Sequence, residues 1–139
     1  MKYKFLPHTA DIKFQAFGKT IEEAFENSAY ALKKVMTKGI KIKSEIKKKI
    51  SVKGKDKESL LYDFLEEFLY LLDAEDFILF SINNLKISEK AVGYMLTCEA
   101  IGDNAKNYKF TNNVKAVTYN EMKIWIEKNK YICQVVVDV

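Results

Sequence analysis

Acidic residues flank the first and last apolar segments of this chain. Asp11 closes the tetrad His8-Thr9-Ala10-Asp11, and Asp138 follows the run Val135-Val136-Val137 and precedes Val139. A carboxylate beside valines at a strand end is unfavourable unless it is solvated, paired or bound to a cation. Asp11, Asp138 and the α-carboxylate of Val139 would supply oxygen ligands, which suit Ca²⁺, Mg²⁺ or Mn²⁺ and not zinc. Because an aspartate at a strand end is often only a cap or turn residue, the spacing leaves both interpretations open.

Lys115 is a second polar residue in an apolar setting. It lies in the strand-like run Val114–Tyr119 and shares its alternation with Val117 and Tyr119. Such a lysine either extends its ammonium group off the sheet into water or pairs with a buried acid. An exposed strand lysine without a function is the alternative.

Other kinds of active site lack the residues they need. The chain has one histidine and two separated cysteines, which excludes His-rich zinc sites and CxxC pairs. It contains neither a glycine-rich nucleotide loop nor a serine-nucleophile motif. We therefore expect a protein that is not itself an enzyme. Cys98 and Cys133 are expected to be reduced and buried, because each lies in an apolar run.

Charge is distributed in two opposite blocks. Residues 38–57 carry nine lysines against two acids, a net charge of +7, and residues 58–76 carry seven acids and no basic residue, a net charge of −7. Blocks of this kind can orient a charged partner. The alternative is that the lysine-rich segment is simply a solvated face. The segment does not by itself indicate nucleic-acid binding.

Composition favours one domain over residues 1–139. The chain is 48% hydrophobic, which suffices for one sizeable core, and no linker or repeat divides it. No segment is long and apolar enough to span a membrane, and the N-terminus differs from a signal peptide. We expect a cytoplasmic protein with no membrane partner.

Two helices and several strands must position the polar residues. Thr20 and Glu23 form a capping box before the first helix, and Gly39 is its expected stop. Asp56 can cap a second helix over about 57–72. Alternating or apolar runs predict strands at 12–17, 40–52, 77–82, 85–87, 92–100, 114–119, 121–127 and 131–137. The run 40–52 is one long strand or two short ones broken near Ser44. Asp103 begins a polar loop that reaches Asn113, and Lys128-Asn129 fits the tip of a hairpin that joins the last two strands. This order predicts an α+β, two-layer sandwich in which two helices pack on one face of a mainly antiparallel sheet.

Several segments stand out in order along essentially the whole chain. They are His8–Asp11 with Gly18, Glu22–Asn27, Leu60–Tyr70, Ala100–Asp103, Val114–Tyr119 and Val136–Val139. Together these segments resemble the archease family. The resemblance implies a protein cofactor that acts with an RtcB-type RNA ligase in tRNA splicing. Such a protein accelerates guanylylation of the ligase and allows multiple turnover, and it meets tRNA only through the ligase.

The resemblance also assigns roles to residues. It implies metal ligands at Asp11, Asp138 and the carboxylate of Val139. Lys115 matches the family's lysine and His8 its motif histidine, and both are expected to orient a ligand or contact the partner. Two positions depart from the family pattern, because Tyr108 and Asn120 stand where many members have histidine. The alternative function is an RNA-binding or chaperone-like module that uses the lysine-rich segment 38–57.

Overall fold

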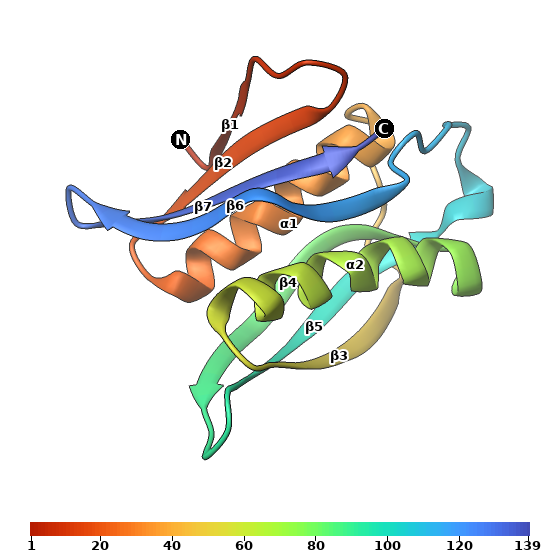
Figure 1. The fold of residues 1–139 in the computed structure, drawn as a ribbon. Helices are drawn as coiled ribbons and strands as arrows, with labels where there is room; N and C mark the ends of the chain where they lie inside the picture. The colour runs from red at the N-terminus through yellow and green to blue at the C-terminus, as the bar shows by residue number, and fades with distance from the viewer.

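Seven strands and two helices form the fold of the computed structural model, which describes residues 1–139 (Figure 1). In chain order they are β1 (Tyr3–Leu6), β2 (Ile12–Gly18), α1 (Ile21–Thr37), β3 (Ile46–Gly54), α2 (Lys57–Glu75), β4 (Phe77–Glu89), β5 (Tyr94–Asn104), β6 (Ala116–Glu127) and β7 (Lys130–Asp138). A short 3₁₀ helix over Ala105–Asn107 follows β5. The predicted α+β class is confirmed.

The strands form two separate antiparallel sheets. One has the order β1-β2-β7-β6, and the other has the order β3-β5-β4. Figure 1 shows the helices between the sheets, and both helices contact strands of both sheets. The expectation of a single sheet is therefore corrected to two, with the helices on one face of each.

Helix α2 shows why two sheets can share the helices. Its buried residues are Leu60, Leu61, Phe64, Leu65, Phe68, Leu69 and Leu71. At about 100° per residue they cover about half of the helix circumference, which is wider than the stripe of about 100° that packing on one surface needs. The 30 buried residues of the core form one cluster that includes both helices and both sheets.

The helix starts follow the sequence prediction. The hydroxyl of Thr20 accepts the N–H of Glu23 at 3.1 Å, and Asp56 accepts the N–H of Ser59 at 2.7 Å. Helix α2 continues to Glu75, three residues beyond the predicted end. Helix α1 ends at Thr37, because Lys38 adopts the left-handed conformation before the predicted stop glycine (φ 55°).

Several strand boundaries differ from the prediction. Residues 40–45 are irregular, and strand β3 begins at Ile46. The two predicted strands at 77–87 are one strand, β4, with irregular pairing between Leu79 and Ser81 and between Asn83 and Lys86. Asp103, predicted in a loop, lies in β5 and is 5% exposed. Lys115 precedes the first residue of β6.

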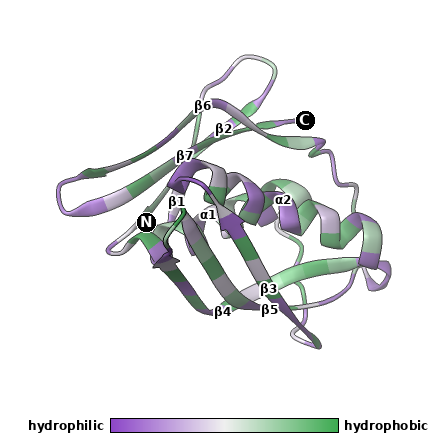
Figure 2. Ribbon diagram, turned by 60° about the horizontal axis from the view of Figure 1, so that its bottom comes forward, coloured by the Kyte–Doolittle hydropathy of each residue, from purple (hydrophilic) through white to green (hydrophobic).

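Alternating side chains place the core on the inner face of each sheet. Hydrophilic and hydrophobic residues alternate along much of the strand ribbon (Figure 2). In β2, Phe14 and Ala16 are fully buried, whereas their neighbours Lys13 and Gln15 are partly exposed. This alternation makes one face of each strand apolar and fixes the strand against the helices.

Candidate functional site

The register of β2 and β7 places Asp11 beside Asp138. Ile12 pairs with Val137 at the end of the antiparallel ladder. Asp11 precedes Ile12 and Asp138 follows Val137, so the two carboxylates occupy neighbouring positions where these two inner strands end. This end of the four-stranded sheet is called the aspartate edge below. Both aspartates are partly exposed, and neither forms an ion pair with a lysine or histidine. The structure therefore brings together two of the predicted ligands from opposite ends of the chain.

The contrast between the two faces of β7 fixes this register. Cys133 and Val135 on one face are fully buried, whereas Gln134 between them is partly exposed. Because successive strand residues face opposite sides, a shift of β7 by one position would exchange its two faces. Cys133 and Val135, which face the helices beside Ala16 and Phe14, would then exchange places with Gln134. The packing of β7 thus determines where Asp138 lies.

Lys115 joins the same edge through its backbone. Its N–H donates a hydrogen bond to the carbonyl of Asp138 at 2.8 Å, and the next residue, Ala116, pairs with Asp138. Lys115 is exposed and lines a shallow groove of about 530 Å³ that also contains four acids of α2, namely Asp63, Glu66, Glu67 and Asp73. The lysine therefore lies between the aspartate edge and an acidic helix surface.

Oxygen atoms are the donors that this edge offers to a cation. Asp11 and Asp138 carry carboxylate oxygens, and Val139, the third predicted donor, follows Asp138 and is partly exposed. No three His, Cys, Asp or Glu side chains converge as a ready-made metal centre in this chain. A cation here would be held by two side chains and by terminal or main-chain oxygens. That donor set fits a hard divalent ion.

His8 contacts Glu121 in the structure. Its Nε2 lies 2.7 Å from Oε2 of Glu121, and Nζ of Lys13 donates to Oε1 of the same carboxylate at 3.0 Å. Hydrogen bonds from His8 and then Lys13 lower the pKa of Glu121 from its usual value. The other ring nitrogen of His8, Nδ1, is buried and has no hydrogen-bond partner. The structure records no hydrogen bond from His8 to Asp11 or Asp138.

Glu121 and Glu66 are site residues that the sequence did not single out. Glu121 has a left-handed backbone (φ 55°) in the irregular part of β6, where pairing with β7 shifts register. Glu66 on α2 accepts the N–H of Val117 on β6 at 2.9 Å. The one available signal was the acidic block of residues 58–76, which gave no reason to prefer Glu66 within it.

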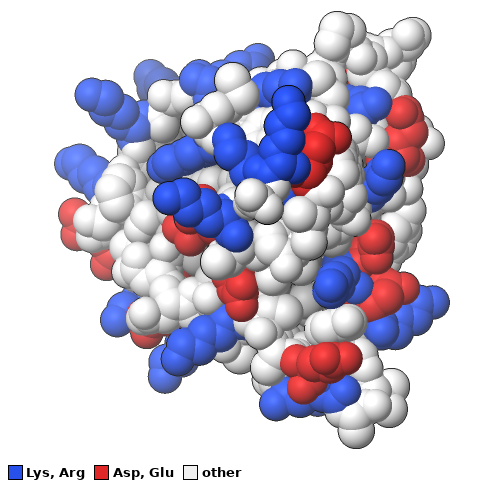
Figure 3. Space-filling view, turned by 90° about the vertical axis from the view of Figure 1, so that its left-hand side faces the viewer, with Lys and Arg blue, Asp and Glu red and all other residues white.

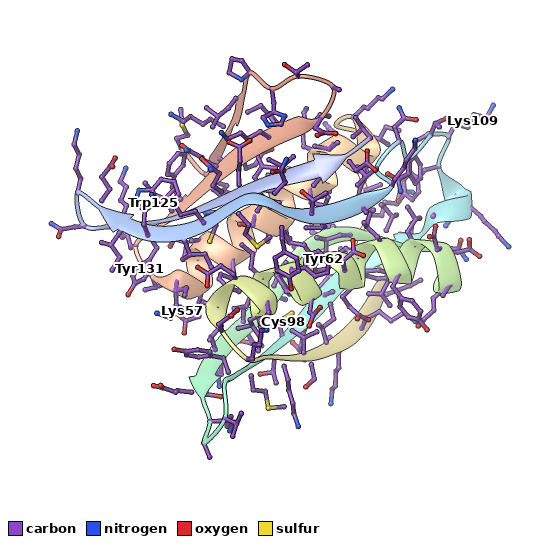
Figure 4. The ribbon with its side chains drawn as sticks, viewed as in Figure 1. Lys57, Tyr62, Cys98, Lys109, Trp125 and Tyr131 are labelled. Atoms are coloured by element: carbon purple, nitrogen blue, oxygen red, sulfur yellow. The ribbon has the colours of Figure 1, made fainter.

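An aromatic pair also connects α2 with β6. The rings of Tyr62 and Tyr119 stack with centroids 4.3 Å apart and planes at 7°. Figure 4 shows Tyr62 on the side of α2 that faces β6. Together with the hydrogen bond that the N–H of Val117 donates to Glu66, this contact fixes the start of β6, which follows Lys115.

Tyr108, one of the two departures from the family pattern, has a structural role. Its hydroxyl donates to Oδ2 of Asp103 at 2.7 Å and accepts the N–H of Lys43 at 2.8 Å. The hydrogen bond from Tyr108 is the main cause that lowers the pKa of Asp103. Asn120, the second departure, is exposed, and its N–H donates to the hydroxyl of Thr118.

Part of the lysine-rich segment is paired with acids. Lys48 lies 2.6 Å from Glu75, and Lys47 lies 3.7 Å from Glu99. Two lysines of β3 are therefore neutralised by carboxylates. On the side of the molecule that forms the left of Figure 1, lysines gather mainly in the upper part, above the level of β3, with acids among and below them (Figure 3).

Neither helix is both long enough and apolar enough to cross a membrane.

Comparison with known proteins gives a consistent family. The model of the Archease protein family (MTH1598/TM1083) matches residues 3–139. Protein archease of Methanosarcina barkeri is 41% identical over an alignment of 142 positions, which covers 99% of this chain and 96% of that protein. Protein archease of Methanothermobacter thermautotrophicus is 39% identical over 137 residues, which cover 98% of this chain and 97% of that protein.

Solved structures agree with this result. The solution structure of protein 1598 from Methanobacterium thermoautotrophicum has a TM-score of 0.83 and 34% identity, and the match covers 99% of each chain. A crystal structure of an archease from Thermotoga maritima, described as a possible chaperone, has a TM-score of 0.63 and 21% identity over 98% of this chain and 96% of that one. The second likeness concerns the fold alone. The chain belongs to the archease family.

Proposed function

We propose that this protein is a non-catalytic activator of an RtcB-type RNA ligase in tRNA splicing. In this role it promotes guanylylation of the ligase and so allows multiple turnover, in the cytoplasm. Family membership supports the proposal. The single observation that carries it is the adjacency of Asp11 and Asp138, which the β2–β7 register creates from residues at the two ends of the chain.

The proposed working part is a hard-cation site at this edge. Asp11, Asp138 and the carboxylate of Val139 would hold Ca²⁺, Mg²⁺ or Mn²⁺ through oxygen atoms. Two neighbouring carboxylates without a basic partner repel each other, and a divalent cation between them removes that repulsion. When bound, the ion supplies a positive centre that can be offered to the ligase or to its triphosphate substrate.

Lys115 supplies a second, permanent positive charge beside that edge. Its backbone is held to Asp138, and its exposed side chain lines the acidic groove along α2. A lysine in this position can contact a phosphate or an acidic group on the ligase. His8 contributes through Glu121 and Lys13, which tie the loop before Asp11 to β6. That tie limits the positions that Asp11 can adopt.

A ligase assay tests the proposal. Asp11→Asn and Asp138→Asn keep the size of each side chain but remove its charge, and Glu89→Gln removes an exposed carboxylate at the end of β4 as a matched control. We expect both aspartate variants to fold and to reduce stimulation of ligase guanylylation by at least about tenfold, as loss of metal-site residues commonly does. The control should stimulate like the wild type. Full stimulation by both aspartate variants would falsify the metal-site mechanism.

The alternative function, RNA binding or chaperone action through residues 38–57, has weaker support. Lys47 and Lys48 on β3 already pair with Glu99 and Glu75. Binding of duplex RNA by the remaining lysines would weaken steeply with salt. A ligase-independent affinity for duplex RNA that falls in this way, and that survives Asp138→Asn, would favour the alternative.

A further inference from the structure

A pocket that is lined by α1 but not by α2 has no part in the proposed function. It has a volume of about 550 Å³ and lies between β1, the second half of α1, the segment 39–42 and β4. Its basic lining residues are Lys2, Lys33, Lys34 and Lys41, and its aromatic ones are Tyr3, Tyr30 and Phe80. Small-molecule sites commonly have volumes of about 300–1,000 Å³. The pocket is thus large enough for a ligand of ordinary size.

The positive charge of this pocket is not neutralised. No carboxylate lines it, and none lies within ion-pair distance of any of its four lysines. The C-terminal end of α1 contributes a partial negative charge of about half a unit, which four ammonium groups exceed several-fold. Burial, and then the charge of Lys2, lower the pKa of Lys33. The lysines therefore repel one another, and a bound anion would relieve that repulsion.

An irregularity of β4 places an aromatic ring at the pocket. The ladder with β5 passes from Leu79 opposite Gly102 to Ser81 opposite Ile101, so Phe80 is an extra residue without a partner. Bulges of this kind redirect a side chain out of the regular alternation. The Phe80 side chain is 42% exposed, which is unusual for a residue beside three buried neighbours, Phe77, Ile78 and Leu79.

Lys33 holds the bulge in place. Its Nζ donates to the carbonyl of Phe80 at 3.0 Å and lies 5.5 Å from the centroid of the Phe80 ring. Lys34 lies so close to Gly39 that a Cβ atom on that glycine would be 2.6 Å from its Nζ. Gly39 has a φ of 86°, so glycine suits both its conformation and the space left for Lys34. The pocket thus contains an exposed aromatic ring together with ammonium groups that have no carboxylate partner.

We propose that this pocket binds a nucleotide, with its phosphate against Lys2, Lys34 and Lys41 and its base against Phe80. Ammonium groups bind phosphate oxygens through charge-assisted hydrogen bonds. An exposed aromatic ring beside a basic groove is the arrangement that accepts a base by stacking. A free nucleotide and the terminal nucleotide of an RNA strand present the same chemistry to the pocket.

Calorimetric titration of the isolated protein at low salt tests this site. The probes are adenosine monophosphate, inorganic phosphate and a short single-stranded RNA with a 5′-phosphate. Lys2→Gln with Lys41→Gln should weaken binding of all three probes by about tenfold or more, the effect of losing charge-assisted contacts. Phe80→Ala should weaken binding of the nucleotide and the RNA by about tenfold, typical of one lost stack, and should leave inorganic phosphate unaffected.

The matched control removes the same charge elsewhere. Lys90→Gln with Lys109→Gln changes two exposed lysines outside the pocket. All of the substituted side chains are exposed, so each variant should keep the wild-type circular dichroism spectrum. If AMP binds as tightly as the RNA, a free nucleotide is the ligand; if the RNA binds more tightly, a strand end is.

Three results would overturn the inference. They are no binding of AMP or RNA at millimolar concentration, equal losses in the control and pocket variants, and a Phe80→Ala variant with unchanged nucleotide affinity. None of the titrations contains a ligase. Their outcome is therefore independent of whether the proposed function is correct.

Discussion

The carboxylate of Glu66 on α2 accepts the backbone N–H of Val117 on β6, with 2.9 Å between the two atoms. Val117 is 2% exposed, so water cannot readily replace this acceptor. The bond holds the start of β6, two residues after Lys115, against the helix. An acid of α2 thereby positions a strand of the proposed site.

Removing this acceptor should destabilise the protein. Glu66→Ala leaves the buried N–H of Val117 without a partner, which costs about 1–3 kcal/mol of unfolding free energy. Urea denaturation measures the loss. Glu66→Gln is the control, since its amide oxygen can still accept the hydrogen bond, and it should recover most of the stability. Equal losses in both variants would show that charge and not hydrogen bonding is responsible.

Calcium should stabilise the folded protein through Asp11 and Asp138. A ligand at about 100 times its dissociation constant adds about 2.7 kcal/mol to the unfolding free energy, which corresponds to a rise of about 10 °C in Tm for a domain of this size. Differential scanning fluorimetry with and without chelator measures it. Asp11→Asn and Asp138→Asn should show no rise, whereas Glu89→Gln should behave like the wild type. A calcium-dependent rise that persists in both aspartate variants would place the ion elsewhere.

The contacts of Glu121 predict a pH-dependent stability. His8 and Lys13 lower the pKa of Glu121 below its ordinary value of 4.5. A lowered folded-state pKa contributes stability that is present above pH 4.5 and is lost as the pH falls through the folded-state value. Glu121→Gln should therefore be less stable than the wild type at neutral pH, and the difference should shrink below pH 4.5. Unfolding free energies measured across this range would refute the prediction if the gap stayed constant.

The two cysteines should be unreactive in the folded protein. Burial is the main cause that raises the pKa of both thiols, Cys98 and Cys133, to about 12. The reactive thiolate is then almost absent at neutral pH. A chromogenic disulfide reagent should label both thiols in denaturant and neither in native buffer. Rapid labelling of Cys133, which is fully buried, would mean that β7 opens readily.

Local features of the sequence predicted the elements well. Thr20 and Asp56 mark helix starts because a cap needs only residues within the next turn. The hairpin at Lys128-Asn129 was also predictable, and both residues have positive φ as a tight hairpin requires. The number of sheets was not predictable, because alternation shows which face of β3 is buried but not that β5 is its partner.

The candidate site, like the fold, could be predicted only in part from the sequence. Asp11 and Asp138 were recognisable as carboxylates at strand ends, and the pairing of Ile12 with Val137 now makes them neighbours. The contact between His8 and Glu121 spans 113 positions and depends on an irregular turn of β6, which periodicity does not reveal. Long-range pairing of polar side chains thus needed the three-dimensional structure.

The division of the strands into two sheets leaves four strand edges that could recruit another chain: β1, β6, β3 and β4. An open edge with free N–H and C=O groups is a template for aggregation. Each edge here has its own obstacle. Strand β1 has only four residues, and β3 carries Lys47, Lys48, Lys49 and Lys53. On β6 the N–H of Val117 already donates to Glu66, and on β4 the bulge at Phe80 interrupts the strand.

These obstacles give the lysines of β3 a role that needs no nucleic acid. An approaching strand would have to bring its own backbone against a row of ammonium groups, which is unfavourable. Replacing those lysines with threonine would therefore leave the fold intact but make the protein prone to self-association. In this protein, resistance to aggregation is a property of the strand edges as much as of the core.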